Sequence, residues 1–333
     1  MYKVEKFGKG GISAKIVADS INPNGNRITT YELEYHRYIH GEVMTHRLFS
    51  RNAMSSRAVP VVKMIEQVRN SPAIPTHWGA NQSGMQADNE CNNPIDLGAP
   101  VTFSAEEAWV KSGSYMMTNL AEEFSKAGYH KQIVNRLLEP FQMMKIVLTA
   151  TEFENFFWLR CDTDAQPEIQ ELARLMFECR EESEPELLKV GEYHTPYVEH
   201  LDRPDGSAGV AYAIFDTGVE RYLTEEEAIA ISSSCCAQVS FRNIDNSFEK
   251  AMKVYERLGV GGSKIHASPF EHVACPLPDY SKGGNSFLTG SGDVPKELWL
   301  KGITHMDREG NYWSGNFKGW LQHRQLLGNH TKW

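Results

Sequence analysis

The period of the hydrophobic residues changes along the chain, and each change predicts a different kind of element. Residues 27–38 read RITTYELEYHRY, where β-branched and aromatic residues roughly alternate with polar ones, as is typical of a strand. Residues 71–100 carry four prolines, three glycines and many asparagines, so we expect a long ordered loop there. A loop of this kind would suit a lid over a ligand site.

Helical periodicity dominates the middle of the chain. Residues 104–107 have the serine and glutamate of a capping box, and the segment after them predicts a helix that ends near Gly128. A second helix is expected over residues 130–148. Asp164 is expected to cap a third helix, with Pro167 in its first turn. This part of the chain is therefore predicted to be mostly helical.

A further unit is expected after residues 183–216, whose scattered prolines and short apolar runs predict a connection with one strand or hairpin. Thr224 and Glu227 form another capping box, which precedes a helix rich in alanine, isoleucine, serine and cysteine. Residues 248–259 predict a helix that ends at its final glycine. The tail, residues 281–333, is rich in glycine and tryptophan.

Composition indicates a protein with a large core. The 333 residues are 41% hydrophobic and 23% charged, which suits two domains, and we place these at residues 1–200 and 217–333. The net charge of −9 argues against a surface that coats nucleic acid, because duplex binding needs a dense set of lysines and arginines. A local cluster of arginines is still enough to bind a small phosphorylated ligand.

Location and metal content are inferred from missing patterns. The sequence has no run of 18 apolar residues and no basic-then-apolar leader, so we expect a cytoplasmic protein without a membrane partner. None of the six cysteines forms a CxxC pair, which argues against a zinc or redox motif and favours reduced thiols.

The strongest local signal is the segment of residues 45–57, THRLFSRNAMSSR, which directly follows the predicted strand region. It concentrates three arginines, a histidine, an asparagine and three serines in thirteen positions. Arginine forks bind phosphate oxygens in pairs, while hydroxyl and amide groups are able to fix a ribose or a base edge. The segment therefore predicts an anion site, although a solvated polar loop has the same composition.

The spacing H-R-x-x-S-x-N-x-x-S-x-R within this segment resembles the signature of flavin-dependent thymidylate synthases. That signature usually begins with one more arginine, where this chain has Thr45. Ala53 stands where the family usually has an acidic residue, and Ala58 where an aromatic residue is common. These departures concern the details of substrate contact.

Two further stretches resemble the same family. Residues 155–170, NFFWLRCDTDAQPEIQ, are similar to the stretch in which an asparagine and, five residues later, an arginine precede an acidic residue and A-Q-x-E-I. Arg136 and Pro140 resemble the family's arginine that lies four residues before a proline and reaches the nucleotide phosphate. A charge on the surface of a helix is the other interpretation of Arg136.

Residues 266–272, HASPFEH, resemble the family's flavin-binding segment H-x-[ST]-P-F-E-H. In the family this segment precedes the arginine motif, whereas here it follows the motif by about 200 residues, together with a helix and AQVSF. A rearranged or partly duplicated chain accounts for the order if the C-terminal unit folds back or pairs with another subunit. A structural turn with buried histidines and a metal site of His266, Glu271 and His272 are the alternatives.

The resemblance implies an α/β (α+β) protein with a largely antiparallel sheet flanked by long helices, assembled as a homo-oligomer, either a tetramer or a dimer. It implies FAD as cofactor and NADPH and methylenetetrahydrofolate as co-substrates. The implied reaction puts a one-carbon unit on C5 of a pyrimidine deoxynucleoside monophosphate, converting dUMP to dTMP. No metal is expected.

Roles are carried over only at matching positions. The implied catalytic residues are Ser55 and Arg160, although Ser55 is not assigned as a nucleophile because the sequence shows no neighbouring base. The implied substrate-binding residues are Glu42, Ser55, Arg57, Arg136 and Arg160. The implied cofactor-binding residues are His46, Arg47, Asn52, Asn155, His266, Ser268 and Glu271.

Three questions stay open at the level of sequence. Glu42 stands where the family commonly has a glutamine. A carboxylate accepts a hydrogen bond from the amino group of cytosine, so dCMP is a possible substrate, as is a hydroxymethyl product. Alternatively, Glu42 simply pairs with a nearby arginine. A second alternative is a protein that binds the flavin or the nucleotide without catalysing a reaction. A zinc hydrolase is disfavoured because the sequence lacks an HExxH-type helix. HRQLLGN at residues 323–329 shares three positions with HRLFSRN at residues 46–52, through duplication or coincidence.

Overall fold

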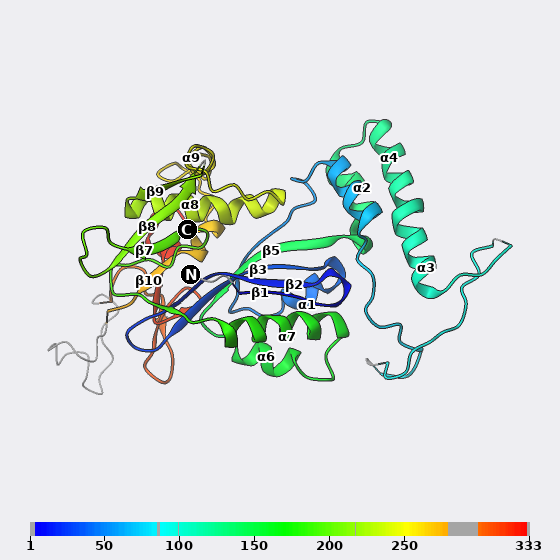
Figure 1. The fold of residues 1–333 in the computed structure, drawn as a ribbon, viewed down its shortest axis with the longest axis horizontal. Helices are drawn as coiled ribbons and strands as arrows, with labels where there is room; N and C mark the ends of the chain where they lie inside the picture. Colours follow the sequence, from blue (N-terminus) through cyan, green and yellow to red (C-terminus); the bar gives the residue numbers. More distant parts are fainter. Residues whose placement is uncertain (1–3, 85–86, 99, 217, 279–298, 332–333) are drawn as a thin grey trace.

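The computed structural model describes residues 4–84, 87–98, 100–216, 218–278 and 299–331 (Figure 1). Its main sheet has six strands: β1 (Glu5–Phe7), β2 (Ser13–Ile21), β3 (Arg27–His36), β4 (Ser50–Ala53), β5 (Met143–Ala150) and β6 (Glu186–Leu187). The strand order is β1-β2-β3-β5-β4, all antiparallel, while β6 pairs with β2 in parallel. The expected α+β fold with a largely antiparallel sheet and flanking helices is confirmed.

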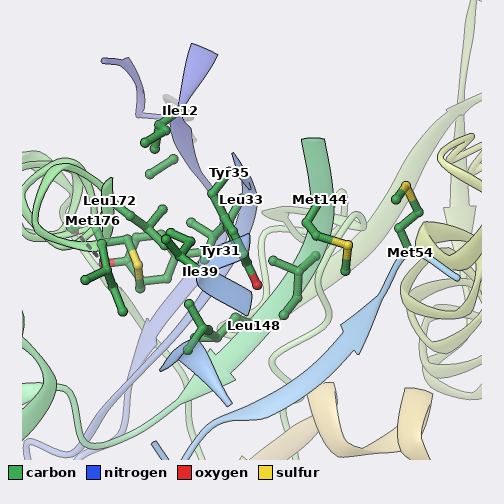
Figure 2. Packing of buried hydrophobic residues seen from close by; sticks show 14 of the residues in the cluster. Ile12, Tyr31, Leu33, Tyr35, Ile39, Met54, Met144, Leu148, Leu172 and Met176 are labelled. Atoms are coloured by element: carbon green, nitrogen blue, oxygen red, sulfur yellow. Dashed lines mark hydrogen bonds between the residues drawn. The ribbon is translucent and has the colours of Figure 1, made fainter. Parts of the chain in front are cut away.

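One face of the sheet is covered by α6 (Glu154–Arg160) and α7 (Pro167–Glu182) (Figure 1). The alternation predicted for β3 puts Tyr31 and Leu33 on this face, where both are buried. Figure 2 shows Tyr31 beside Met176 of α7, and its hydroxyl donates a hydrogen bond of 2.9 Å to the Met176 carbonyl. This layer forms the largest core of the molecule.

An arm of helices extends from one end of the sheet (Figure 1). It comprises α2 (Val61–Asn70), α3 (Ala105–Val110), a π-helical stretch (Lys111–Met117) and α4 (Thr118–Lys126). The capping box of Ser104 and Glu107 is present, and Gly128 has the positive φ of 87° that ends a helix. The predicted helix is therefore confirmed, with a π-helical stretch that its sequence did not reveal.

The helix expected over residues 130–148 is wrong. Only the turn α5 (Lys131–Val134) is α-helical, and a 3-10 stretch (Asn135–Phe141) that contains Pro140 leads into β5. Because β5 lies between β3 and β4 and is buried on both faces, it is apolar almost throughout and has no period of two. Such a run resembles part of a buried helix.

The third predicted helix exists as α7, but its expected cap is wrong. Gln166 is the N-cap residue, and Pro167 occupies the first helical position. Asp164 lies two residues before the cap, and its backbone N–H donates to the Asp162 carboxylate. Sequence reasoning also missed α6, whose seven residues are too few for a clear helical period.

The C-terminal half contains a small sheet and two helices. The strands β7 (Glu199–Asp202), β8 (Val210–Asp216) and β9 (Val219–Leu223) are antiparallel neighbours. The helices α8 (Glu225–Gln238) and α9 (Phe248–Arg257) follow, and the capping box at Thr224 and the positive φ of Gly259 confirm the expected ends. The expected loop at residues 71–100 holds only two isolated β-bridges in its described part; residues 85–86 and 99 lie outside the described residues.

Short elements complete the chain. They are η5 (Val239–Phe241), η6 (Ser268–His272), β10 (Ala274–Pro276), β11 (His305–Met306), β12 (Tyr312–Ser314), β13 (Phe317–Lys318), β14 (Trp320–Gln322) and η8 (His323–Leu326). β14 pairs with β10, so the described part of the tail, residues 299–331, returns to the HASPFEH region. Residues 281–298 of the expected tail lie outside the described residues. No helix within the described ranges is long and apolar enough to cross a membrane.

A chain of hydrogen bonds between fully buried side chains joins the main sheet to the C-terminal half. Ser20 and Thr30 contact the two ring nitrogens of His194 at 2.9 and 2.8 Å. Thr30 also contacts Thr149 at 2.7 Å, and Thr149 contacts Nδ1 of His272 at 2.8 Å. Burial lowers the pKa of His272 to about 3 and that of His194 well below its usual range, so both rings are neutral at pH 7.

We predict that Thr149→Val destabilises the fold by about 1–3 kcal/mol, because it removes the hydroxyl that serves His272 and keeps the side-chain volume. Urea unfolding followed by circular dichroism measures the effect. Thr102→Val, at an exposed position, is the matched control and should change stability by less than about 0.5 kcal/mol. Equal midpoints for the two variants would contradict a stabilising role of this chain.

We predict that the free energy of unfolding falls as the pH drops below about 6.5. In this range the histidines of the unfolded chain become protonated, whereas the buried rings of the folded protein stay neutral. The folded pKa of His272 is depressed, so its contribution is complete above the unfolded pKa and is lost between about 6.5 and about 3. Each such histidine contributes a slope of about 1.4 kcal/mol per pH unit in that window. Unfolding free energies at several pH values measure the slope, which should be shallower in His272→Gln.

Candidate functional site

The arginine motif starts in the turn after α1 (His40–Val43) and runs into β4 at the edge of the main sheet. Arg51 holds this turn, since its guanidinium donates to the carbonyls of Val43 and His46 at 3.3 and 3.1 Å. Burial is the largest influence on Arg51 and lowers its pKa, while nearby Glu271 acts in the opposite direction. A half-buried cation of the motif thus fixes the turn that precedes β4.

Three of the predicted site residues meet at the end of α6. Arg160 donates from Nε to Nε2 of His46 at 3.1 Å and from a terminal nitrogen to the Glu42 carboxylate at 3.4 Å. Burial, followed by the charges of Arg160 and Arg51, lowers the pKa of His46 to about 4. Because arginine only donates, Nε2 of the neutral ring must accept, and Nδ1 carries the proton. Glu42 and His46 together set the direction of the Arg160 guanidinium.

Arg57 and Arg136 lie on two segments that are tied together. The side-chain amide of Asn135 donates to the carbonyls of Ser56 and Val59 at 2.8 and 3.0 Å. The residues next to these anchors, Arg136 and Arg57, are both exposed. Asn135 therefore cross-links the two segments that carry these guanidinium groups.

Segments from far along the chain pack against the motif. The backbone N–H of Ser55 donates to the carbonyl of Ser240 in η5 at 3.2 Å, and η6, which carries most of HASPFEH, packs against β4. In the tail, Asn316 donates to the Leu48 carbonyl at 2.7 Å, and Ser50 donates to Asn316 at 3.2 Å. AQVSF and HASPFEH therefore adjoin the arginine motif in space, although about 200 residues separate them in sequence.

The remaining predicted cofactor residues differ in exposure. Arg47, Asn155, His266 and Ser268 are exposed, whereas Glu271 is half-buried and forms an ion pair with Arg324. Asn52 is buried on β4, and its side-chain oxygen has no hydrogen-bond partner among the described residues. Asn155 is the second residue of α6 and Arg160 is its last, so the helix holds these two residues near opposite ends.

An open cleft of about 1070 Å³ lies beside Arg160 and Glu42. The 71–100 loop forms part of its wall, together with the connection between α6 and α7. Its acidic lining residues are Glu42, Asp88, Glu90, Asp164, Glu168 and Glu171; its lysine and arginine lining residues are Lys9 and Arg160. Carboxylates disfavour an anionic group and accept hydrogen bonds from donors. This lining is therefore poorly suited to a phosphate group.

Glu168 anchors the loop, a role that sequence reasoning missed. Its buried carboxylate accepts from the backbone N–H and the hydroxyl of Thr76, at 2.7 and 3.1 Å, and from Gln166 at 3.0 Å. Glu168 is the glutamate of A-Q-x-E-I, so the motif supplied a signal for this position but no function. The loop is thus fastened to the start of α7.

Other residues at the junction were also missed. Arg242 follows η5 with a positive φ of 56° and donates to the Met143 carbonyl at 2.7 Å, while pairing with Glu34. Gln322 in β14 donates to Ser50 at 3.3 Å. The sequence carries no local pattern for these contacts, because each joins residues that are far apart in the chain.

The alternative of a metal site at HASPFEH receives no support. Within the part of the chain that the structure describes, no group of three or more histidine, cysteine, aspartate or glutamate residues is arranged to hold a metal ion. Nδ1 of His272 is engaged by Thr149, and the Glu271 carboxylate by Arg324.

Comparison with known proteins gives a family match within the first part of the chain. A family model described as thymidylate synthase complementing protein matches residues 28–186, just under half of the length. The match contains the arginine motif and residues 155–170, and HASPFEH lies outside it. A search of curated proteins found no match. Residues 28–186 are therefore similar to the thymidylate synthase complementing proteins, the flavin-dependent thymidylate synthases, an enzyme family of nucleotide biosynthesis.

Proposed function

We propose that this protein uses FAD to transfer a one-carbon unit from methylenetetrahydrofolate to C5 of a pyrimidine deoxynucleoside monophosphate, converting dUMP to dTMP with NADPH as reductant. The observation that carries the proposal is the packing of HASPFEH in η6 against β4, the strand that directly follows His46 and Arg47. The two segments that resemble flavin-binding motifs are thereby neighbours in one protomer.

The residues around β4 fit a flavin. The exposed side chains of Arg47, His266 and Ser268 offer hydrogen-bond donors that are free to face a ligand. The buried side-chain oxygen of Asn52, without a partner among the described residues, offers an acceptor whose desolvation a ligand N–H would offset. When bound and in its reduced form, FAD would supply the hydride that the reaction needs.

The chain's own residues would bind and orient the nucleotide. Arg57 and Arg136 would bind the phosphate, and Ser55 lies two residues before Arg57, whose N–H it accepts. Arg160, directed by His46 and Glu42, would donate to the pyrimidine edge, because its second terminal nitrogen has no partner within the described ranges. The acidic cleft beside Arg160 would keep the phosphate at the Arg57 end.

The pairing of Glu42 with Arg160 favours dUMP over dCMP. A carboxylate that already accepts from a guanidinium has less capacity for the amino group of cytosine. The guanidinium, by contrast, matches the carbonyl oxygens of uracil. Glu42 then acts through Arg160 and does not read the base directly.

The first test is for flavin and turnover. We predict that the purified protein shows flavin absorption bands and releases tritium from [5-³H]dUMP only when methylenetetrahydrofolate and NADPH are present, with slower release from [5-³H]dCMP. Chromatography of the product separates dTMP from the hydroxymethyl nucleotide. A flavoprotein that releases no tritium would be a binder without turnover, and a protein that binds no FAD removes the proposal.

The second test concerns the phosphate. We predict that Arg57→Ala and Arg136→Ala each raise the KM for dUMP by about tenfold or more, because each removes a charge-assisted hydrogen bond, while kcat changes less. Arg257→Ala, at an exposed position at the end of α9, is the matched control and should leave both constants unchanged. An unchanged KM in both test variants would show that the phosphate binds elsewhere.

A further inference from the structure

The second HR pair, His323 and Arg324, also lies against HASPFEH. The pair begins η8, which follows β14. Because β14 pairs with β10, η8 packs against η6. The backbone N–H of His323 donates to the Val273 carbonyl at 2.8 Å. HASPFEH, which packs against β4 beside the first HR pair, is therefore also in contact with the second HR pair.

Both side chains of the second pair are held in place. Arg324 forms an ion pair with Glu271 in η6. The ring of His323 lies between Phe270 and Tyr193, with ring centroids 6.0 and 6.2 Å away. Glu271 also acts electrostatically on Arg51 of the first HR motif, where burial lowers the pKa of the guanidinium and Glu271 opposes that effect.

Three nitrogens in this part of the tail are enclosed and have no hydrogen-bond partner in the described residues: Nε of Arg324, Nδ1 of His323 and Nδ1 of His330. An enclosed polar group without a partner is destabilising, so three of them within eight residues point to a missing ligand. Burial lowers the pKa of His323 to about 4, and burial and Arg324 lower that of His330. Each neutral ring keeps one N–H to donate.

A glycine-rich loop contacts Asn329, the residue before His330. Residues 259–264, GVGGSK, follow α9, and Gly259 and Gly261 have positive φ values of 81° and 76°. Asn329, the neighbour of His330, donates from its side-chain amide to the Gly262 carbonyl. Backbone turns of this kind expose N–H groups that bind anions, and Lys264 at the end of the loop is exposed. The same loop leads directly into HASPFEH.

We propose that Arg324, His330 and the loop of residues 259–264 form a binding site for the phosphate group of a nucleotide ligand beside HASPFEH. A phosphate has several acceptor oxygens, and it satisfies a guanidinium, an imidazole and backbone donors that approach from different elements. The phosphate belongs either to the pyrophosphate of FAD or to a separate nucleotide. The first source rests on the proposed function, and the second does not.

The experiment measures binding of pyrophosphate and of ADP by isothermal titration calorimetry to the full chain from which any bound flavin has been removed, and then to the same chain loaded with FAD. Arg324→Gln is expected to weaken pyrophosphate binding by about tenfold or more, because a charged donor is lost. Arg308→Gln, exposed in the turn between β11 and β12, makes the same change in charge and should have no effect. His330→Gln leaves the Glu271 ion pair intact, and it is expected to weaken binding even if Arg324→Gln fails to fold.

The same titrations on the FAD-loaded protein identify the ligand to which the phosphate belongs. If FAD abolishes pyrophosphate binding, the site holds the flavin's own phosphates; if ADP still binds and depends on Arg324, the site takes a separate nucleotide. Dependence on Arg324 in a protein that releases no tritium from dUMP would support this site while the proposed function fails. Absence of pyrophosphate binding to the flavin-free chain, or equal affinity in flavin-free wild type, Arg324→Gln and His330→Gln, overturns the site.

Discussion

The constraint on which the structure depends is the need of buried polar side chains for partners. Thr30 and Thr149 lie at the centre of the main sheet, fully buried, and a hydroxyl there is costly unless it is hydrogen-bonded. His194 and His272 satisfy them from the C-terminal half. Because His272 is the last residue of HASPFEH, these bonds also hold that segment beside β4. The polar centre of the sheet thus positions a segment that resembles a flavin site.

Charge is arranged in two zones around this junction. The exposed Arg57 and Arg136 lie on segments that Asn135 ties together, and carboxylates dominate the lining of the cleft beside Arg160. In the proposed function, this distribution of charge would orient a nucleotide with its phosphate toward Arg57 and Arg136. Within the cleft, Glu42 reduces the local charge of Arg160 and fixes its direction. The half-buried His46 stays neutral and contributes as an acceptor.

HASPFEH lies between two HR pairs, and Glu271 is the residue that relates them. It pairs with Arg324 and influences Arg51, which supports the turn of the first pair. This arrangement gives the sequence similarity of residues 46–52 and 323–329 a physical counterpart, since both segments approach the same short element. The two HR pairs are not equivalent in their surroundings, because His46 contacts Arg160 whereas His323 is packed between aromatic rings.

The sequence by itself determined the elements that depend on interactions between near neighbours, such as the capping boxes at Ser104 and Thr224 and the alternation of β3. It also showed the motifs that resemble those of a known family. These patterns link residues within a few positions, so they survive without tertiary context. Only the tertiary structure decided that Met143–Ala150 is a strand, because a strand buried on both faces has no period of its own. It also decided that HASPFEH and the tail meet the arginine motif, since contacts across 200 residues depend on sheet register and buried hydrogen bonds that no local pattern encodes.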